Sequence, residues 1–317
     1  MDKSVNTSII FFGTPEFALP SLEALIENGY APELVVTKPD EPAGRKQIIT
    51  PPPVKVYAER HHIPVFQPIH LEHELDKIPD ADLFIVVAFG LMIPQKAIAK
   101  PMRGTLNVHP SLLPHWRGPS PIQSAILNSD AQTGVTLMQI DELMDHGPII
   151  AQELFSLLEK KWTSPELHDS LADLGARMLI KAIPEWMNCT ITAVPQDDMK
   201  ATYCKLLKKD HGRITWSRPA DEIERMTRAY APWPSAWTLW PGREKIYRIR
   251  IDEADVTDDE SPVGSPGYVW QTTDHPLLIK TGKGSLTVRK ITIEGKTTLD
   301  AKSFLRGNPE LIGATFV

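Results

Sequence analysis

The segment Leu106 to Pro114 carries two side chains suited to acyl transfer. Asn107 and His109 lie two residues apart at the end of an expected strand, so both side chains point to one face. An amide N–H can donate to a carbonyl oxygen that is gaining negative charge, and an imidazole can carry a proton near neutral pH. Taken alone, an Asn-x-His at a strand end is more often a packing or capping feature. A catalytic role for this pair therefore needs support from a third group nearby.

A carboxylate follows another expected strand, Gly134 to Ile140. Asp145 lies in the loop after that strand, which opens on the same edge of the sheet. Its carboxylate could orient His109, fix the ring tautomer and stabilise the protonated ring. An Asp two residues before Gly147 is also a common turn pattern. Asn107, His109 and Asp145 are therefore the candidate catalytic residues, with packing, capping and turn roles as the alternatives.

The sequence lacks the motifs of several other kinds of catalysis. The sequence has no Gly-x-Ser-x-Gly turn, no cysteine in an activating setting and no His-Glu-x-x-His. The first expected strand-to-helix turn, Gly13 to Pro15, lacks the glycines that a dinucleotide needs. We therefore expect the substrate's own nucleophile to attack directly, with no covalent enzyme intermediate and no metal.

These residues need a scaffold, and the first half of the chain predicts one. Short apolar runs alternate with segments of helical periodicity, and the strongest run is Asp82 to Ala88. A long helix opens at Thr163 to Glu166, with a hydroxyl cap and an early proline. Such alternation predicts a doubly wound, mostly parallel α/β sheet over residues 1–195. The other strands are expected at Ser8–Phe12, Leu34–Thr37, Pro64–Phe66, Gly104–Val108 and Gly134–Ile140, and the other helices at Ala18–Asn28, Lys55–His62 and Ser120–Asn128.

The last third of the chain predicts an all-β domain. After one expected helix, Asp221 to Tyr230, short β-like runs follow one another with Gly and Pro between them. This pattern favours a small β-barrel over residues 213–317. Residues 196–212 form a basic linker between the two domains, and Asn188 to Pro195 is expected to be a short strand before it. The expected barrel strands are Tyr247–Ile251, Gly267–Trp270, Leu277–Thr281 and Ser285–Ile293.

Composition excludes several classes of protein. Hydrophobic residues make up 42% of the 317 residues and charged residues 23%, as in soluble globular proteins. The start does not resemble a signal peptide, and the apolar runs are too short to span a membrane. Cys189 and Cys204 indicate neither a disulfide framework nor a zinc site, so we expect a cytoplasmic protein. The net charge of −6 disfavours a basic surface overall but allows a local basic stripe for RNA.

The catalytic motif and its surroundings resemble those of the folate-dependent formyltransferases at Asn107-x-His109, Ser111–Pro114, Asp145, Trp116–Gln123 and Gly13–Pro15. These motifs are shared with formyltransferases of sugars and of glycinamide ribonucleotide, so they indicate the chemistry more than the acceptor. The resemblance implies that an amine attacks the formyl carbon of 10-formyltetrahydrofolate. Asn107 and His109 would stabilise the tetrahedral oxyanion, and Asp145 would support His109 and proton transfer.

The acceptor is indicated by further segments over essentially the whole chain. They resemble the methionyl-tRNA formyltransferase subgroup, which implies the α-amine of initiator methionyl-tRNA as the acceptor. The resemblance also implies that the carboxy-terminal domain is an OB-like β-barrel that binds tRNA. The segments are Pro42–Arg45, Pro53–Lys55, Pro64–Pro68, Ile214–Ser217 and Arg228–Pro234.

The resemblance also implies binding residues. The pterin would lie against pocket-facing backbone, although the same apolar residues could be only core. The basic linker could follow the phosphates of an acceptor stem, although each lysine could equally be a solvated surface charge. The expected folate-binding residues are Phe89, Gly90, Leu91, Ile93, Ser111, Leu112, Leu113 and Pro114, and the expected tRNA-binding residues are Arg45, Lys46, Lys205, Lys208 and Lys209.

One position departs from the family, and three alternatives stay open. Where the family usually carries Arg between Asp and Pro, this sequence has Glu41, which would repel phosphate. Arg45 and Lys46 could carry the contact, or selectivity for tRNA could be weaker. The alternatives are a sugar-nucleotide N-formyltransferase, a non-catalytic tRNA- or folate-binding module, and a hydrolase of formylfolate. We expect a monomer.

Overall fold

The computed structural model describes residues 7–44, 47–242, 245–259 and 264–317. The chain divides into two compact units, which are described separately. The first unit holds Met1–Pro121, Gln132–Ser156 and His168–Cys204. The second unit holds Ile122–Ala131, Leu157–Leu167 and Lys205–Val317. The boundary after the long helix therefore falls at Cys204, within the segment that the sequence predicts to be a linker.

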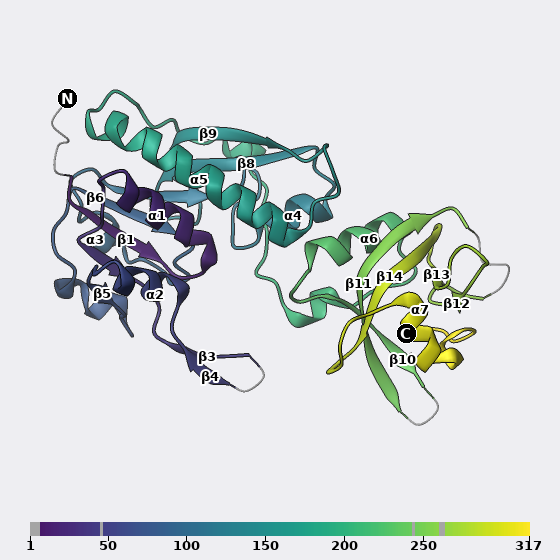
Figure 1. The fold of residues 1–317 in the computed structure, drawn as a ribbon. Helices are drawn as coiled ribbons and strands as arrows, with labels where there is room; N and C mark the ends of the chain where they lie inside the picture. Colours follow the sequence, from purple (N-terminus) through teal and green to yellow (C-terminus); the bar gives the residue numbers. More distant parts are fainter. Residues whose placement is uncertain (1–6, 45–46, 243–244, 260–263) are drawn as a thin grey trace. The chain divides into compact units, whose positions relative to one another are not determined.

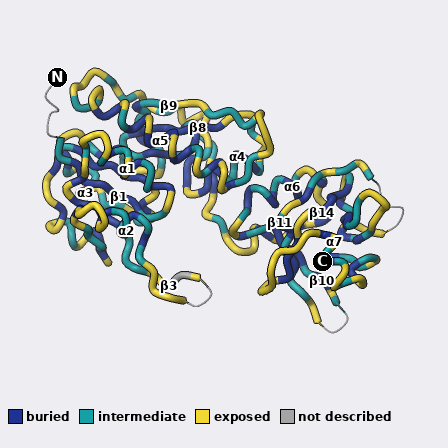
Figure 2. Tube along the Cα trace, viewed as in Figure 1, coloured by how far each residue is buried: buried dark blue, intermediate teal, exposed yellow. Residues whose placement is uncertain are grey.

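A seven-stranded sheet forms the centre of the first unit, in the order β5-β2-β1-β6-β7-β8-β9 (Figure 1). The first five of these strands are parallel, while β8 and β9 run antiparallel at one edge. Figure 2 shows the strand β1 as buried, as expected for an apolar strand covered on both faces. The prediction of a mostly parallel α/β sheet is confirmed. The strands are β1 Ile9–Gly13, β2 Leu34–Val36, β5 Val65–Phe66, β6 Leu83–Val87, β7 Thr105–His109, β8 Gln132–Gln139 and β9 Ile149–Ser156.

Helices and short 3-10 segments connect the strands. The longest helix, α5, spans Ser164–Met187 and contains Pro184. At Gly175 it approaches β7 so closely that an added Cβ would lie 2.6 Å from Val108 Cγ1. Val108 therefore faces α5, and its neighbours on β7 point to the opposite face of the sheet. The other helices of the first unit are α1 Leu19–Glu27, α2 Pro53–Arg60 and α3 Gln95–Ile98, and its 3-10 segments are Glu16–Ala18, Leu71–His73, Leu75–Lys77 and Asp198–Lys200. The helix α4 Pro121–Leu127 begins at the unit boundary, and the 3-10 segment Lys209–Gly212 belongs to the second unit.

A two-stranded hairpin projects from the connection between β2 and α2. It consists of β3 Glu41–Ala43 and β4 Ile48–Thr50, and β4 is exposed along its length (Figure 2). Ile48 and Ile49 are about 60% exposed, at 61% and 62%. The sequence does not predict this hairpin because each strand has only 3 residues and β4 contributes to no buried face.

An antiparallel sheet forms the second unit, in the order β10-β11-β14-β13-β12, with β15 paired to β14 (Figure 1). The chain's last residues join its two outer strands. Val317 exchanges two backbone hydrogen bonds with Leu239 of β10, at 2.9 and 3.0 Å, while Val269 of β12 donates to Ala314 at 2.9 Å. This closure confirms the prediction of a small β-barrel. The strands are β10 Ala236–Pro241, β11 Ile246–Thr257, β12 Val269–Trp270, β13 Leu278–Lys280, β14 Ser285–Ile293 and β15 Leu299–Asp300, and the helical segments are α6 Ala220–Ala229, α7 Ala301–Gly307 and the 3-10 turn Pro309–Leu311.

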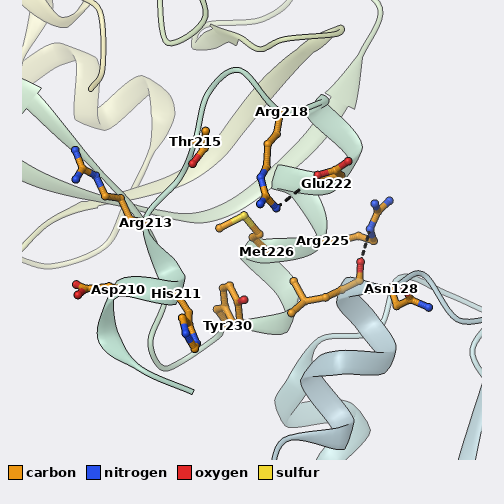
Figure 3. A pocket seen from close by; sticks show the side chains of 11 residues that line it. Asn128, Asp210, His211, Arg213, Thr215, Arg218, Glu222, Arg225, Met226 and Tyr230 are labelled. Carbon is orange, nitrogen blue, oxygen red and sulfur yellow. Dashed lines mark hydrogen bonds and ion pairs between the residues drawn. The ribbon is translucent and has the colours of Figure 1, made fainter. Parts of the chain in front are cut away.

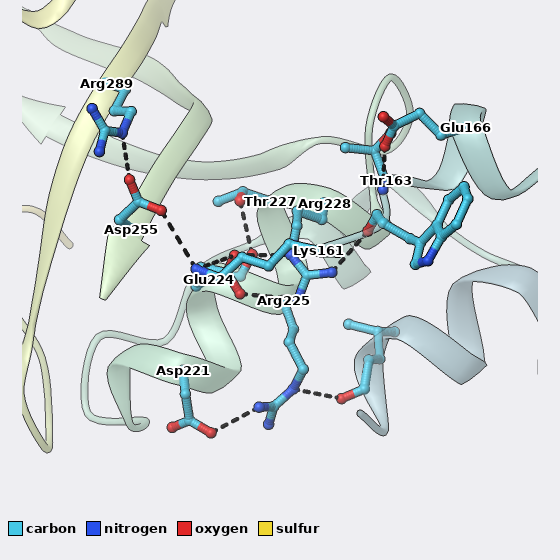
Figure 4. Close-up of polar contacts among 12 residues, drawn as sticks. Lys161, Thr163, Glu166, Asp221, Glu224, Arg225, Thr227, Arg228, Asp255 and Arg289 are labelled. Carbon is cyan, nitrogen blue, oxygen red and sulfur yellow. Dashed lines mark hydrogen bonds and ion pairs between the residues drawn. The ribbon is translucent and has the colours of Figure 1, made fainter. Parts of the chain in front are cut away.

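A network of charged side chains fastens the segment Leu157–Leu167 to the rest of the second unit (Figure 4). Glu224 of α6 is 4% exposed and accepts two hydrogen bonds from Arg228, at 2.8 and 3.0 Å. Arg228 also donates to the carbonyl of Trp162 at 2.7 Å. Lys161 Nζ lies 3.4 Å from both Glu224 and Asp255. The buried carboxylate of Glu224 is thus paired with two cations, which offsets the cost of removing it from water.

Several elements differ from the sequence predictions. Strand β9 is not predicted because it is an edge strand with three consecutive exposed residues, so it lacks a continuous apolar run. The segment Asn188 to Pro195 forms no strand, and only Val194 makes a β-bridge, to Ile149. Among the described residues, no helix is both long enough and apolar enough to cross a membrane.

Candidate active site

Strand β7 places two polar side chains on the face of the sheet that α5 does not cover. Asn107 and His109 alternate with Val108, which packs toward Gly175 of α5. Asn107 is half-buried between Val86 of β6 and Met138 of β8. Its side chain takes part in none of the hydrogen bonds between described residues, so its amide N–H groups are available to a ligand.

The imidazole of His109 lies between a carboxylate and a carbonyl. Its Nδ1 is 3.6 Å from Oδ1 of Asp145, and its Nε2 is 3.1 Å from the carbonyl oxygen of Trp116. The His109 side chain is 5% exposed and that of Asp145 is 17% exposed. A carbonyl oxygen can only accept, so Nε2 carries a hydrogen. Nδ1 is therefore the nitrogen that can take or release a proton beside the carboxylate.

One short loop contacts both members of this pair. The backbone N–H of Gly118 donates to Oδ2 of Asp145 at 2.8 Å, two residues after the carbonyl that faces His109. Gly118 has φ +118°, and a Cβ at this position would lie 2.4 Å from the carbonyl oxygen of Cys204. Only glycine fits this conformation and this close approach. The loop 116–118 thus fixes the spacing of the acid and the imidazole.

A second short loop carries the acid itself. Asp145 has φ +51°, a left-handed conformation that is uncommon for a residue other than glycine. The side-chain amide of Gln196 donates to the carbonyl oxygens of Asp145 and Gly147, at 2.9 and 2.8 Å. A Cβ on Gly147 would lie 1.9 Å from the carbonyl oxygen of Gln139. The loop 145–147 is therefore held from both sides.

His146, which the sequence leaves without a role, has two carboxylate partners. Its Nδ1 lies 2.6 Å from Asp141 and its Nε2 lies 3.4 Å from Asp198. The hydrogen bond to Asp141 is the largest cause that raises the pKa of His146, with a smaller contribution from Asp198. The hydrogen bond from Arg117 is the largest cause that lowers the pKa of Asp198. Proton uptake at His146 therefore strengthens the contacts around the loop that carries Asp145.

The first group of expected folate-binding residues follows β6. Phe89 is 2% exposed and its ring packs edge-to-face on Phe12 at 5.4 Å. Its carbonyl oxygen accepts a hydrogen bond from Thr14 at 2.7 Å. Gly90 is exposed with φ +82°, while Leu91 and Ile93 pack partly against the core. The ring of Phe89 is therefore core, and ligand contacts from this group would come from the backbone and the partly exposed side chains.

The second group follows β7 and has little freedom. Ser111 is fully buried, and its hydroxyl donates to the carbonyl of His115 at 2.6 Å. Leu113 is 3% exposed and its backbone N–H donates to Thr136 at 3.0 Å. Leu112 and Pro114 are half-buried. This turn supports the end of β7, and only Leu112 and Pro114 have side-chain surface to offer a ligand.

The expected tRNA-binding residues differ in what the structure says of them. Arg45 and Lys46 lie outside the described residues. Lys205, Lys208 and Lys209 are exposed, and their ammonium groups have no ion-pair partner among the described residues. By contrast, four cations of the barrel have carboxylate partners within it. These pairs are Arg248–Glu294, Arg250–Asp252, Arg289–Asp255 and Lys290–Glu253.

A cavity of about 600 Å³ lies within the second unit (Figure 3). Several of the residues that line it follow the exposed lysines 205, 208 and 209 directly in the sequence. Arg213, Arg218 and Arg225 line it together with His211 and Tyr230. Arg225 donates hydrogen bonds to Asp221 and to the carbonyl oxygen of Leu127 (Figure 4). Arg218 lies 3.6 Å from Glu222, so Arg213 is the one arginine of this cavity without a carboxylate partner among the described residues.

Sequence reasoning does not find several residues that build the site. Arg117, Gly118 and Gln196 are not predicted to have a role, although Arg117 and Gly118 lie in the matching segment Trp116 to Gln123. Gln196 carries no signal because its partners lie 51 and 79 residues away. Within the described residues, no three His, Cys, Asp or Glu side chains gather as metal ligands.

The sequence matches two families along its length. Residues 6–183 match the family described as "Formyl transferase", and residues 206–309 match "Formyl transferase, C-terminal domain". A methionyl-tRNA formyltransferase of Methylococcus capsulatus is 41% identical over 304 residues, which cover 95% of this chain and 96% of that protein. A methionyl-tRNA formyltransferase of Chloroflexus aggregans is 42% identical, over 94% of this chain and 96% of that protein.

Solved structures show the same fold at lower identity. An N-formyltransferase from Helicobacter canadensis, in complex with folinic acid and dTDP-3-aminofucose, matches with a TM-score of 0.64 at 23% identity, over 90% of this chain and 98% of that chain. HypX from Aquifex aeolicus, in complex with tetrahydrofolic acid, matches with a TM-score of 0.65 at 17% identity. That match covers 95% of this chain and 47% of HypX.

Proposed function

The chain belongs to the methionyl-tRNA formyltransferase family, and on that premise we propose that it transfers the formyl group of 10-formyltetrahydrofolate to the α-amino group of methionyl initiator tRNA. The observation that carries the proposal is the arrangement at the end of β7. An available amide, Asn107, lies on the same strand face as His109, and Asp145 lies 3.6 Å from His109. These groups suit the attack of an amine on a formyl carbon.

In the proposed reaction the methionyl nitrogen attacks the formyl carbon and a tetrahedral intermediate forms. Asn107 donates a hydrogen bond to the oxygen as it becomes negative. The attacking nitrogen loses a proton to Nδ1 of His109, where Asp145 stabilises the charged ring. The same proton then passes to the folate nitrogen as the bond between that nitrogen and the formyl carbon breaks. Formyl-methionyl-tRNA and tetrahydrofolate leave.

The folate is proposed to bind between the two turns that follow β6 and β7. Gly90, Leu91 and Ile93 offer exposed backbone and apolar surface, and Leu112 and Pro114 offer the remaining side-chain surface. The co-substrate supplies the formyl group, and the protein binds and orients it. Because Phe89, Ser111 and Leu113 are buried, they support these surfaces from behind. The proposed site needs no metal.

The tRNA is proposed to bind through the exposed lysines 205, 208 and 209 and the second unit beyond them. Phosphates need cations that are not already neutralised. The linker lysines have no carboxylate partner among the described residues, whereas Arg248, Arg250, Arg289 and Lys290 are paired inside the barrel. In this proposal residues 1–195 form the catalytic domain, 196–212 the basic linker and 213–317 the tRNA-binding domain. The protein acts as a cytoplasmic monomer.

A comparison of acceptors tests the proposal. The purified protein is given 10-formyltetrahydrofolate with either charged initiator tRNA or a dTDP-amino sugar, in the presence and absence of EDTA. We expect formylmethionyl-tRNA at the same rate in both buffers and no formylated sugar. Turnover of the sugar without turnover of the tRNA would assign the chain to sugar-nucleotide chemistry, and release of formate without an acceptor would make it a hydrolase.

A further inference from the structure

We propose that Gln196, together with Arg117, is a positioning residue that holds Asp145 in its reactive conformation. The inference rests on the proposed function, because it assumes that Asp145 works on His109. Gln196 lies in the segment that the sequence predicts to be a linker, yet all three of its side-chain partners belong to the loops around the candidate site. The first part of this linker is therefore a component of that site.

Every hydrogen-bonding position of the Gln196 amide is occupied. Its Oε1 accepts from Nε and Nη2 of Arg117, at 3.0 and 2.8 Å. Its Nε2 donates to the carbonyl oxygens of Asp145 and Gly147, at 2.9 and 2.8 Å. A flipped amide would face a guanidinium with its NH₂ group and two carbonyls with its oxygen, so the orientation is fixed by chemistry.

Arg117 gives this amide a rigid support. Its side chain is 3% exposed, and it also donates to Asp198 at 2.8 Å. The backbone of Arg117 pairs with the linker, since its N–H donates to the carbonyl of Thr202 and its carbonyl accepts from Cys204, both at 2.9 Å. A buried guanidinium keeps its position only while its donors stay paired. Arg117 therefore cannot shift without breaking several contacts at once.

The contacts converge on the backbone of one strained residue. Asp145 is left-handed, and Gln196 binds the carbonyl oxygens of Asp145 and of the residue two positions later. The carboxylate itself is held by Gly118, the neighbour of Arg117. Backbone strain of this kind persists only where the surroundings over-determine it. Without the two bonds from Gln196 we expect the loop to relax and Asp145 to move relative to His109.

Such a movement would affect the chemical step more than binding. Gln196 makes no hydrogen bond to His109, and its amide is saturated by protein partners, so it has no hydrogen bond left for a substrate. A displacement of about 1 Å at a reacting group costs on the order of 100-fold in rate. The loss should therefore appear in kcat, while the KM values for folate and tRNA stay near those of the wild type.

Two substitutions remove the hydrogen bonds from Gln196 to the loop 145–147. Gln196→Glu keeps an acceptor for Arg117 but replaces both donors to the loop with a carboxylate that repels the carbonyls. Gln196→Met keeps the length of the side chain and removes all four bonds. For both variants we expect kcat to fall by about 10- to 100-fold, with each KM within about twofold of wild type. Gln132→Met, on an exposed glutamine at the start of β8, is the matched control and should leave kcat unchanged.

A double-mutant cycle with Asp145→Asn shows whether Gln196 acts through Asp145. In single-turnover measurements, Gln196→Glu should lower the rate in the wild-type background but have little further effect once Asp145 is replaced. An equal loss in both backgrounds, or a Gln196→Glu protein as fast as the wild type, overturns the inference. If the wild-type protein itself does not formylate the tRNA, the proposed function fails instead, so the two failures are distinguishable.

Discussion

Asp145 approaches His109 most closely through its carboxylate oxygen Oδ1, which lies 3.6 Å from Nδ1 of the imidazole. The other oxygen accepts the backbone N–H of Gly118 at 2.8 Å. The separation of 3.6 Å between Nδ1 and Oδ1 is longer than a hydrogen bond, so Nδ1 of His109 stays available to a substrate. The acid is therefore fixed by the main chain, while its contact with the base can tighten when substrates bind.

Replacing His109 by Ala should lower kcat by about 10²- to 10⁴-fold, the usual contribution of a group that transfers a proton in the rate-limiting step. Equilibrium binding of a folate analogue, measured by fluorescence titration, should change little. The exposed His115 provides the control, because His115→Ala removes an imidazole from the same turn and should keep full activity. Full activity of His109→Ala would remove His109 from the mechanism.

Replacing Asn107 by Ala should cost about 10²- to 10³-fold in kcat, because the developing oxyanion loses a preorganised donor. Asn107→Asp should be slower still, since it places a negative charge where negative charge forms. Stability should be almost unaffected, because no side-chain hydrogen bond to a described residue is lost. Steady-state kinetics and thermal unfolding of both variants check this, and a kcat within threefold of wild type would contradict it.

Reversing the charge of Lys205, Lys208 and Lys209 to Glu should raise KM for the tRNA and reduce the salt dependence of binding, because fewer counterions are released. The rate at saturating tRNA should change much less. The matched control reverses Arg60, Lys96 and Lys181, which are also exposed, lie in the first unit and alter the net charge equally. Equal effects from both triple variants would show that only the overall charge matters.

The stability contributed by His146 should depend on pH. Its pKa is raised above the ordinary value of 6.5 by Asp141 first and Asp198 second. A group with a raised folded-state pKa stabilises fully below its unfolded pKa, and that stabilisation is lost as pH rises through the folded pKa. We expect the unfolding temperature of the wild type, relative to His146→Asn, to be higher at pH 5.5 than at pH 8.5. A difference that does not vary with pH would contradict this.

The pair Glu224–Arg228 should matter for folding and not for chemistry. Glu224→Leu leaves two cations without their buried carboxylate, which should lower the free energy of unfolding by about 3–5 kcal/mol. The control, Asp221→Ala, removes an exposed carboxylate from Arg225 on the same helix and should cost about 1 kcal/mol or less. Urea unfolding of both variants gives the comparison, and equal costs would show that burial of Glu224 is unimportant.

The sequence predicts the elements that have a strong period. The buried runs that become β1, β6 and β7, and the amphipathic α5, appear near their expected positions because their apolar residues repeat at the spacing of a strand or helix. The edge strand β9 and the seven-residue helix α7 are not predicted, because half-exposed or short elements show little hydrophobic periodicity. The hairpin β3–β4 escapes for the same reason.

The candidate site divides in the same way. Asn107, His109 and Asp145 can be found because their residue types are chemical and they follow predicted strands. Gln196 cannot, because its function depends on a fixed amide orientation and on contacts made 51 and 79 residues away. The roles of the folate-binding and tRNA-binding residues remain proposals, and Arg45 and Lys46 lie outside the described residues.

The position of Gln196, Thr202 and Cys204 within the first unit sets a rule for recombining members of this family. A crossover at residue 195, where the sequence suggests that one domain ends, would take Arg117 and Asp145 from one parent and their contact residues 196–204 from the other. Parents that differ at Arg117 or at residues 196–204 would then give chimeras with a mismatched loop. A crossover after Cys204 takes Arg117 and residues 196–204 from one parent, but it separates Leu157–Leu167 from α6. The two parents must therefore also match at Lys161, Glu224 and Arg228.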